Sequence, residues 1–214
     1  MTVLDVGCGN GVLLDQIHLI HKGASLFGTD IAKTRLKHAK ARLPAAHLFS
    51  GDAGCLPCED GSIDWLFLAE VVEHMPDPVM VLTEACRAVR TGGKLVISVP
   101  SLDWYRCLRS LVRLKVRYLD EKEHFREYGR IAMKRFDSFT ELAHPIEAEG
   151  FRLAAHRGIC YFLPLVLFKT PLNRMSAGRK GILPLIHALD DLLGRMPVIR
   201  DFGLYHLFIF VKVK

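Results

Sequence analysis

The sequence predicts an α/β fold in which helices cover both faces of a mostly parallel sheet. Short apolar segments alternate with segments of helical periodicity over residues 1–100, as in chains of strand–helix–strand units. A glycine-rich turn joins the first of these strands to the first helix, a junction typical of doubly wound sheets. With 214 residues, 50% of them hydrophobic, the chain can bury one sizeable core, which favours a single domain over residues 1–214.

The first half of the chain carries the clearest element signals. Apolar and β-branched residues cluster in five expected strands, near residues 2–6, 25–29, 46–49, 64–69 and 94–99. Helical spacing of apolar residues indicates three helices, near residues 11–22, 32–42 and 78–90. Residues 1–100 are therefore interpreted as one half of the fold, built of alternating strands and helices.

The alternation stops after Pro100. A capping box from Ser138 to Glu141 predicts the start of a helix that ends at Gly150. Two further strands are expected at residues 151–157 and 204–213. The rest of this half is interpreted as two insertions, residues 101–135 and 159–203.

The glycine-rich turn is the most informative segment of the chain. An acidic residue and three glycines at alternate positions end the first strand: Asp5, Gly7, Gly9 and Gly11. Glycines permit a tight turn and a close approach of the backbone to a ligand. Asp30 follows the second strand, where its carboxylate can accept hydrogen bonds from both hydroxyls of a ribose. The dinucleotide fingerprint G-x-G-x-x-G is not met, because Val12 stands at its third glycine position, so a nucleoside is favoured over NAD.

The pattern D-x-G-x-G-x-G with an acidic residue after the next strand resembles the class I S-adenosylmethionine-dependent methyltransferases that act on small molecules. Three more segments are similar to motifs of this family in the correct order, namely Ser50–Ala53 (adenine contact), Asp60–Pro78 (fourth strand) and Thr91–Pro100 (glycine turn and fifth strand). Thr91 stands where the family usually has proline. The resemblance implies a Rossmann-like, seven-stranded sheet whose last strand is antiparallel.

The resemblance also implies roles in binding S-adenosyl-L-methionine. Asp5 would support the glycine loop and the methionine ammonium, and Gly7, Gly9 and Gly11 would let the backbone approach the cofactor. The nucleoside would be bound by the Asp30 carboxylate at the ribose, by Ile31 packing on adenine, and by Asp52 and the Ala53 backbone at the adenine edge. The Ala69 carbonyl would face the methionine amino group. For Asp30 and Asp52 the alternative is a capping or turn role, which Asp often has.

Two histidines are candidates for the general base that removes a proton from the methyl acceptor. His124 is the first candidate and His74 the second, because a side chain with a pKa near neutrality can accept a proton from a hydroxyl. The alternatives are that His124 lies in a lid over the cofactor carboxylate and that His74 only orders its loop. No metal is expected, because a sulfonium is already an activated methyl donor.

The two halves of the chain differ in charge. Residues 1–100 hold 9 Lys and Arg against 11 Asp and Glu (net −2), whereas residues 101–214 hold 20 against 12 (net +8). The basic half is therefore expected to face the acceptor, an anionic membrane or a nucleic acid, with solubility as the alternative. Four arginines, Arg106, Arg109, Arg113 and Arg117, recur at helical spacing beside an apolar row, which is typical of a lid helix or of a helix lying on an anionic membrane.

These observations predict a methyltransferase that uses S-adenosylmethionine on a small-molecule, glycan or lipid-linked acceptor. An RNA methyltransferase and a non-catalytic cofactor-binding partner subunit are the alternatives, and nucleic acid ranks behind the other acceptors because no RNA-binding motif is present. The absence of a leader sequence favours a cytoplasmic location, with an option of peripheral association at the inner face of the membrane. The six cysteines, including Cys55-x-x-Cys58, are interpreted as free thiols. The sequence sets no oligomeric state.

Overall fold

The computed structural model describes residues 1–100, 139–159, 188–189, 191–193, 195–196 and 205–214. His124, the four arginines of the predicted basic helix, Ser138 and most of the two predicted insertions lie outside these residues. None of the helices in the described part of the chain is long and apolar enough to cross a membrane.

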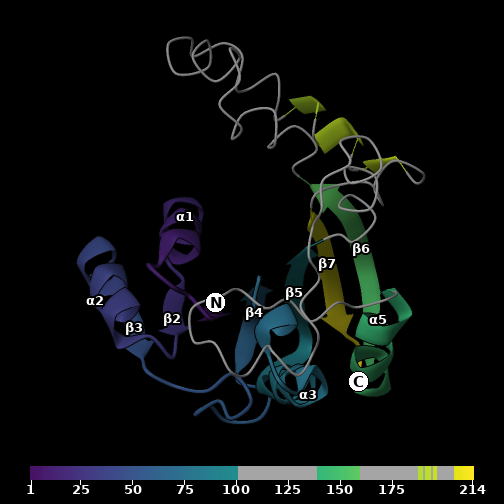
Figure 1. Cartoon of the computed structure of the whole chain (residues 1–214), viewed down its shortest axis with the longest axis horizontal. Helices are drawn as coiled ribbons and strands as arrows, with labels where there is room; N and C mark the ends of the chain where they lie inside the picture. Colours follow the sequence, from purple (N-terminus) through teal and green to yellow (C-terminus); the bar gives the residue numbers. More distant parts are fainter. Residues whose placement is uncertain (101–138, 160–187, 190, 194, 197–204) are drawn as a thin grey trace, which may run out of the picture. The chain divides into compact units, whose positions relative to one another are not determined.

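Seven strands form one sheet in the order β3-β2-β1-β4-β5-β7-β6 (Figure 1). The strands are β1 (Thr2–Val6), β2 (Ser25–Thr29), β3 (His47–Phe49), β4 (Ile63–Ala69), β5 (Val89–Pro100), β6 (Phe151–Ile159) and β7 (Tyr205–Lys212). The pairs β1–β2, β1–β4, β2–β3 and β4–β5 are parallel, and β7 is antiparallel. The predicted mixed, seven-stranded sheet is confirmed.

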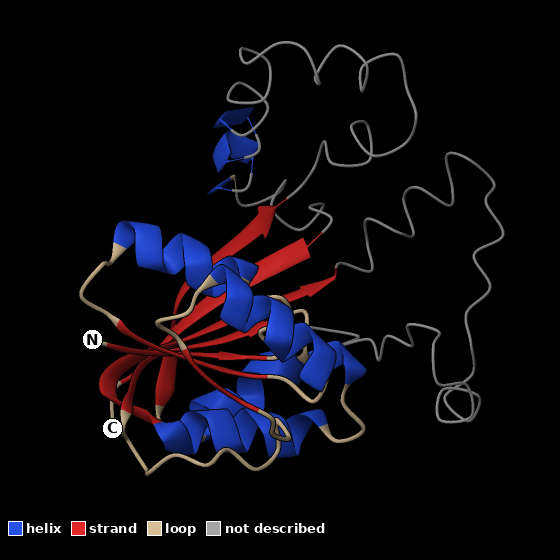
Figure 2. Ribbon diagram, turned by 90° about the vertical axis from the view of Figure 1, so that its left-hand side faces the viewer, coloured by secondary structure: helices blue, strands red, loops and turns tan. Residues whose placement is uncertain are grey.

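Helices lie on both sides of the sheet (Figure 2). They are α1 (Val12–Ile20), α2 (Lys33–Arg42), the 3-10 helix η1 (Val72–His74), α3 (Pro78–Ala88) and α5 (Phe139–Ala148). Alternation along β1 separates two apolar cores, because successive side chains of a strand point to opposite faces. Leu4 and Val6 pack in the core that includes α3 and α5, whereas Val3 packs with Leu14 of α1 and Leu26 of β2.

The predicted helix boundaries and the strand at residues 94–99 need corrections. The helix expected at residues 78–90 ends at Ala88, because Val89 has extended backbone angles and already pairs with Ile63 of β4. The fifth strand therefore begins at Val89 and runs to Pro100, with Gly92 at a positive φ of 77°. The helix expected to end at Gly150 ends at Ala148, and Gly150 follows it in the left-handed conformation, with a φ of 83°.

The chain divides into two compact units. The larger consists of Met1–Val99, Asp120–Ala155 and Phe208–Lys214, and the smaller of Pro100–Leu119 and His156–Leu207. Every described residue of the predicted cofactor site belongs to the larger unit. In the smaller unit His156 and His206 form a ring-nitrogen hydrogen bond of 3.1 Å, and Arg157 forms an ion pair with Asp191. The single domain over residues 1–214 remains a prediction.

Candidate functional site

The glycine loop is held to the end of β2 by backbone hydrogen bonds. The N–H groups of Gly7 and Cys8 both donate to the Thr29 carbonyl, at 2.7 and 2.9 Å. Gly7, Gly9 and Gly11 all have positive φ angles, of 72°, 53° and 73°. Residues that carry a side chain rarely adopt these backbone angles, so glycine is favoured at each of the three positions.

The three glycines have different surroundings. A Cβ atom on Gly7 would lie 2.5 Å from Cγ2 of Val71, and one on Gly11 would lie 2.9 Å from Cβ of Ala39 in α2. A Cβ atom on Gly9 would have no atom within 4 Å. Gly7 and Gly11 thus permit close packing of the loop against its neighbours, while Gly9 borders the open space in which a ligand can approach the backbone.

Asp30 lies directly after β2 and is 7% exposed. Its Oδ2 atom accepts a hydrogen bond from the Gly9 N–H at 2.9 Å, and its Oδ1 atom accepts one from the Ala32 N–H at 2.7 Å. The alternative for this residue was a capping or turn role, and the turn role is present, whereas the N-cap of α2 is Ala32 and has no side-chain cap. Each carboxylate oxygen has a second acceptor site, so the same group can also accept from ribose hydroxyls. The neighbouring Ile31 is 80% exposed and offers an uncovered apolar surface of the kind on which an adenine ring packs.

Asp5 is buried beneath the glycine loop, with 2% of its surface exposed. Burial and the nearby charge of Asp30 raise the pKa of Asp5 to about 7. A cation brought near this carboxyl group would favour its ionised form and offset part of the cost of burial. This environment fits the implied support of an ammonium group.

The predicted adenine loop follows β3. Asp52 is exposed, and its Oδ1 atom accepts a hydrogen bond from the Gly54 N–H at 2.8 Å, which forms a tight Asx-type turn. The turn role that was the alternative for Asp52 is thus present, and Oδ2 forms no hydrogen bond within the described part of the chain. Ala53 is half-buried and packs against the core that includes α3 and α5. Met80 of α3 packs closely on Gly54, where a Cβ atom would lie 2.3 Å from its Cε.

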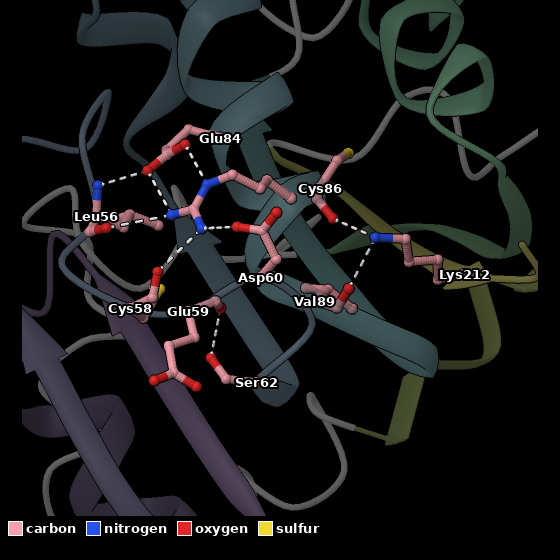
Figure 3. Close-up of polar contacts among 10 residues, drawn as sticks. Leu56, Cys58, Glu59, Asp60, Ser62, Glu84, Cys86, Val89 and Lys212 are labelled. Atoms are coloured by element: carbon pink, nitrogen blue, oxygen red, sulfur yellow. Dashed lines mark hydrogen bonds and ion pairs between the residues drawn. The ribbon is translucent and has the colours of Figure 1, made fainter.

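Arg87 of α3 holds the segment that follows this loop, in which Figure 3 labels Leu56, Cys58 and Asp60. Its guanidinium donates to the Cys58 carbonyl at 2.9 Å, to the Leu56 carbonyl at 3.2 Å and to the carboxylate of Asp60. Glu84, one turn earlier on α3, binds Arg87 through both carboxylate oxygens at 2.8 Å and also accepts the Leu56 N–H at 2.7 Å. The sequence reasoning missed this pair, because its partners lie 27 to 31 residues away from Arg87 in the chain.

Cys55 and Cys58, in the same segment, are free thiols, as expected. Burial raises the pKa of Cys58 despite the nearby Arg87. No group of three or more His, Cys, Asp or Glu side chains within the described ranges is placed to hold a metal ion.

The carboxyl end of β4 brings together Ala69, two glutamates and His74. Ala69 is exposed and pairs in register with Ser98 of β5. The next residue, Glu70, has a φ of 56°, and its Oε1 atom accepts a hydrogen bond from the Ser98 hydroxyl at 2.7 Å. Glu73 of η1 is 2% exposed, and its Oε1 atom lies 3.9 Å from Nε2 of the more exposed His74.

Burial raises the pKa of both glutamates, and the charge of Glu73 contributes to the raised pKa of Glu70. Sequence reasoning named Ala69 and His74 as site residues at this position, and gave no role to either glutamate. The available signal was a pair of carboxylates three residues apart, Glu70 and Glu73, directly after the end of a strand that reaches the cofactor loop.

The glycine loop, the Asp30 carboxylate and the exposed Ile31 side chain follow the carboxyl ends of β1 and β2, which is where open α/β sheets bind their ligands. A family model described as a methyltransferase domain matches residues 4–97. The ubiquinone biosynthesis O-methyltransferase of Nitrosomonas europaea is 30% identical over 171 residues, which cover 75% of this chain and 67% of that protein. The chain belongs to the class I S-adenosylmethionine-dependent methyltransferases, and S-adenosylmethionine is the methyl donor of this family.

Other similarities cover different shares of the proteins compared. A crystal structure of an S-adenosylmethionine-dependent methyltransferase from Methanosarcina mazei has a TM-score of 0.63 and 19% identity, covering 99% of this chain and 92% of that one. A protein of transposon TN4556 from Streptomyces fradiae is 37% identical over 107 residues, which cover 48% of this chain. The chain spans only 30% of the length of that transposon protein. The ubiquinone biosynthesis O-methyltransferase of Acinetobacter baylyi is 26% identical, and the match covers 66% of that enzyme.

Proposed function

We propose that this chain transfers the methyl group of S-adenosylmethionine to a hydroxyl group of a small, quinone-like acceptor. The observation that carries the proposal is the 30% identity to a ubiquinone biosynthesis O-methyltransferase, which extends over 75% of this chain and so beyond the cofactor-binding half. Glycan and lipid-linked acceptors, which the sequence also favoured, are competing outcomes of the same test.

S-adenosylmethionine supplies a methyl group on a sulfonium, so the chain's main task is to align the acceptor with it. Asp30 would bind the ribose hydroxyls, with Ile31 and Asp52 at the adenine. Gly9 would leave the loop backbone open to the cofactor, and Asp5 would favour the methionine ammonium. These roles rest on the open surroundings of Gly9, the spare acceptor sites of Asp30 and the exposure of Ile31.

The charge at the carboxyl end of β4 supports a neutral acceptor. Glu70 and Glu73 flank Val71 and Val72 in the sequence, and the Val71 side chain packs on the glycine loop at Gly7. Their raised pKa values indicate that the described surroundings supply too little positive charge to offset burial. A phosphate-rich acceptor such as RNA would add negative charge to this position, whereas a hydroxyl group can donate a hydrogen bond to it.

Calorimetry and transfer of a labelled methyl group test the proposal. S-adenosylhomocysteine should bind and NAD should not. Labelled S-adenosylmethionine should then methylate a dihydroxybenzene or quinol in preference to a monosaccharide, a lipid-linked glycan or transfer RNA. Transfer to RNA alone would contradict the proposed acceptor, and cofactor binding without transfer to any acceptor would favour a non-catalytic partner subunit.

The positive charge of residues 101–214 supports a second, separate proposal, that the protein associates with anionic membranes through Arg106, Arg109, Arg113 and Arg117. Vesicles containing phosphatidylglycerol should co-sediment the protein at low salt, and replacing all four arginines by glutamate should abolish this without changing cofactor affinity. Equal binding to neutral vesicles, or no binding to either kind, would contradict it.

A further inference from the structure

Two glutamates at the carboxyl end of β4 have no part in the cofactor contacts described above. Neither carboxylate oxygen of Glu73 receives a hydrogen bond from the described N–H and O–H donors, although the residue is 2% exposed. A buried, ionised carboxylate without donors is costly, which makes a structural role in the ionised form unfavourable. A proton shared with Glu70, whose carboxyl group interacts with it, would satisfy both side chains.

Glu70 is placed toward the cofactor side of the sheet. It directly follows Ala69, and the next residue, Val71, lies against Gly7 of the glycine loop. Its carboxylate accepts a hydrogen bond from the hydroxyl of Ser98. Side chains alternate along a strand, so Ser98 lies on the same face of the sheet as Lys94, which contacts Trp65 of β4. Trp65 packs against the core formed with α1, so this is the face on which the glycine loop leads into α1.

The backbone of Glu70 is itself unusual. It is the only non-glycine residue with a positive φ, 56°, in the described part of the chain. This conformation disfavours side chains with a Cβ atom, and such strain gathers at functional sites. The Glu70 N–H donates to the Ser98 carbonyl at 3.2 Å, and together with the hydroxyl contact this fixes the residue from β5.

We propose that Glu70 is the catalytic base that takes the proton from the acceptor hydroxyl, and that Glu73 is a positioning residue that shares a proton with it. In the step, the acceptor oxygen attacks the methyl carbon and the methyl–sulfur bond breaks, leaving its electron pair on the sulfur. The hydroxyl proton passes to a carboxylate oxygen of Glu70, and S-adenosylhomocysteine and the methyl ether are the products. This inference rests on the proposed O-methyl transfer.

Burial is the largest cause of the raised pKa of Glu70, and three neighbouring groups adjust this pKa further. The Ser98 hydroxyl from β5 stabilises the carboxylate and lowers its pKa, the Glu73 charge from η1 raises it, and His74 from η1 lowers it when protonated. Asp5 is the titratable group of the adjacent strand β1 and lies buried below the loop. Replacing Ser98 or Glu73 should therefore shift the acidic limb of the pH profile in opposite directions.

The test uses the full chain with 1,2-dihydroxybenzene and its 4-nitro derivative, which has a more acidic hydroxyl. Glu70→Gln should reduce turnover of the first by about 10²- to 10⁴-fold and of the second by much less, with unchanged affinity for S-adenosylhomocysteine. Ser98→Ala should move the acidic limb to higher pH, and Glu73→Gln should move it to lower pH. Glu59→Gln, at an exposed glutamate in the loop before β4, is the matched control and should leave turnover and its pH profile unchanged.

Carbon-13 NMR of the glutamate carboxyl groups gives a readout independent of turnover. Glu70 should titrate well above the usual range for glutamate, and its titration should move toward that range in the Glu73→Gln variant. An ordinary titration of Glu70, an equal loss of turnover with both acceptors, or a larger loss in His74→Ala would overturn the proposal. Activity lost to a chelator and restored by Mg²⁺ would also overturn it, because the carboxylates would then be metal ligands.

If the wild-type protein methylates no hydroxyl acceptor, the proposed function fails, and the NMR titration still decides whether the two glutamates share a proton. A shared proton in an enzyme that methylates only nitrogen or carbon would overturn the role of Glu70 as the base for a hydroxyl. The two failures are therefore distinguishable.

Discussion

At the scale of single residues, each glycine of the loop satisfies a different steric requirement. Gly7 and Gly11 face packed side chains, whereas Gly9 faces open space, although all three share a left-handed backbone. The sequence pattern assigned one common role to the three, because alternate glycines look alike in a sequence. Their separate roles depend on Val71 and Ala39, which reach the loop from other elements.

The glycines give a matched pair of substitutions. Gly11→Ala should lower the free energy of unfolding by about 2–4 kcal/mol, since the left-handed backbone disfavours a Cβ atom and the Ala39 contact overpacks the site. Gly9→Ala should cost only about 1–2 kcal/mol from the backbone term, but it should weaken cofactor binding, because its Cβ atom projects into the open space. Urea denaturation and calorimetry with S-adenosylhomocysteine measure the two effects. A larger loss of stability in Gly9→Ala than in Gly11→Ala would contradict this assignment.

Asp30 accepts hydrogen bonds from the loop, and the proposed function gives it the ribose as well, so its substitution should affect ligand binding more than the fold. Asp30→Asn keeps the shape but removes the charge and one acceptor oxygen, and cofactor binding should weaken by roughly 1.5–3 kcal/mol. Calorimetry at constant pH measures the loss, with Glu59→Gln as a control for the removal of one exposed negative charge. An unchanged affinity in Asp30→Asn would mean that the ribose site is elsewhere.

At the scale of elements, local sequence patterns predicted the strands and helices of residues 1–100 well. They did not predict contacts between residues that are distant in the sequence. The strand at Ser25–Thr29 and the loop from Gly7 to Gly11 were predictable because their signals lie in adjacent residues. The contact of Glu70 with Ser98 was not, because it depends on the register in which β4 pairs with β5. The early start of β5 at Val89 escaped for the same reason, since pairing with Ile63 overrides helical spacing at that residue.

Helix α3 holds the segment after the proposed adenine loop through Arg87. Arg87→Met should lower the free energy of unfolding by about 1–3 kcal/mol, and cofactor affinity should fall with it. The substitution leaves the Cys58 carbonyl without its donor and removes one of the two donors of the Leu56 carbonyl, which keeps the Cys58 N–H. Arg90→Met is the matched control, since Arg90 forms an ion pair with Asp64 and is 52% exposed, and it should cost about 0–1 kcal/mol. Thermal unfolding with and without S-adenosylhomocysteine separates the two effects. Equal losses in both variants would contradict a specific role for Arg87.

At the scale of the whole molecule, the buried carboxyl groups couple stability to pH. Asp5 binds its proton more tightly in the folded state, with a pKa of about 7, than in the unfolded state, where the ordinary value of 3.8 applies. The folded protein therefore holds more protons between these values, and stability decreases as pH rises through this window. Glu70 and Glu73 act in the same direction, because burial also raises the pKa of both.

The free energy of unfolding of the ligand-free protein should accordingly fall between about pH 5 and pH 8, and Asp5→Asn should reduce this slope. The substitution removes a buried charge that can cost up to about 4 kcal/mol at pH 8, so the variant should be more stable than the wild type there. Cofactor affinity should change in the opposite sense: it should rise with pH in the wild type, as an ammonium favours the ionised Asp5, and lose this dependence in the variant. Urea denaturation and calorimetry at matched pH values measure both quantities.

A wild-type stability that rises from pH 5 to pH 8, or an unchanged slope in Asp5→Asn, would show that Asp5 does not hold its proton in the folded protein. Opposite trends in the two quantities would show that the loop gives up stability to bind a cation.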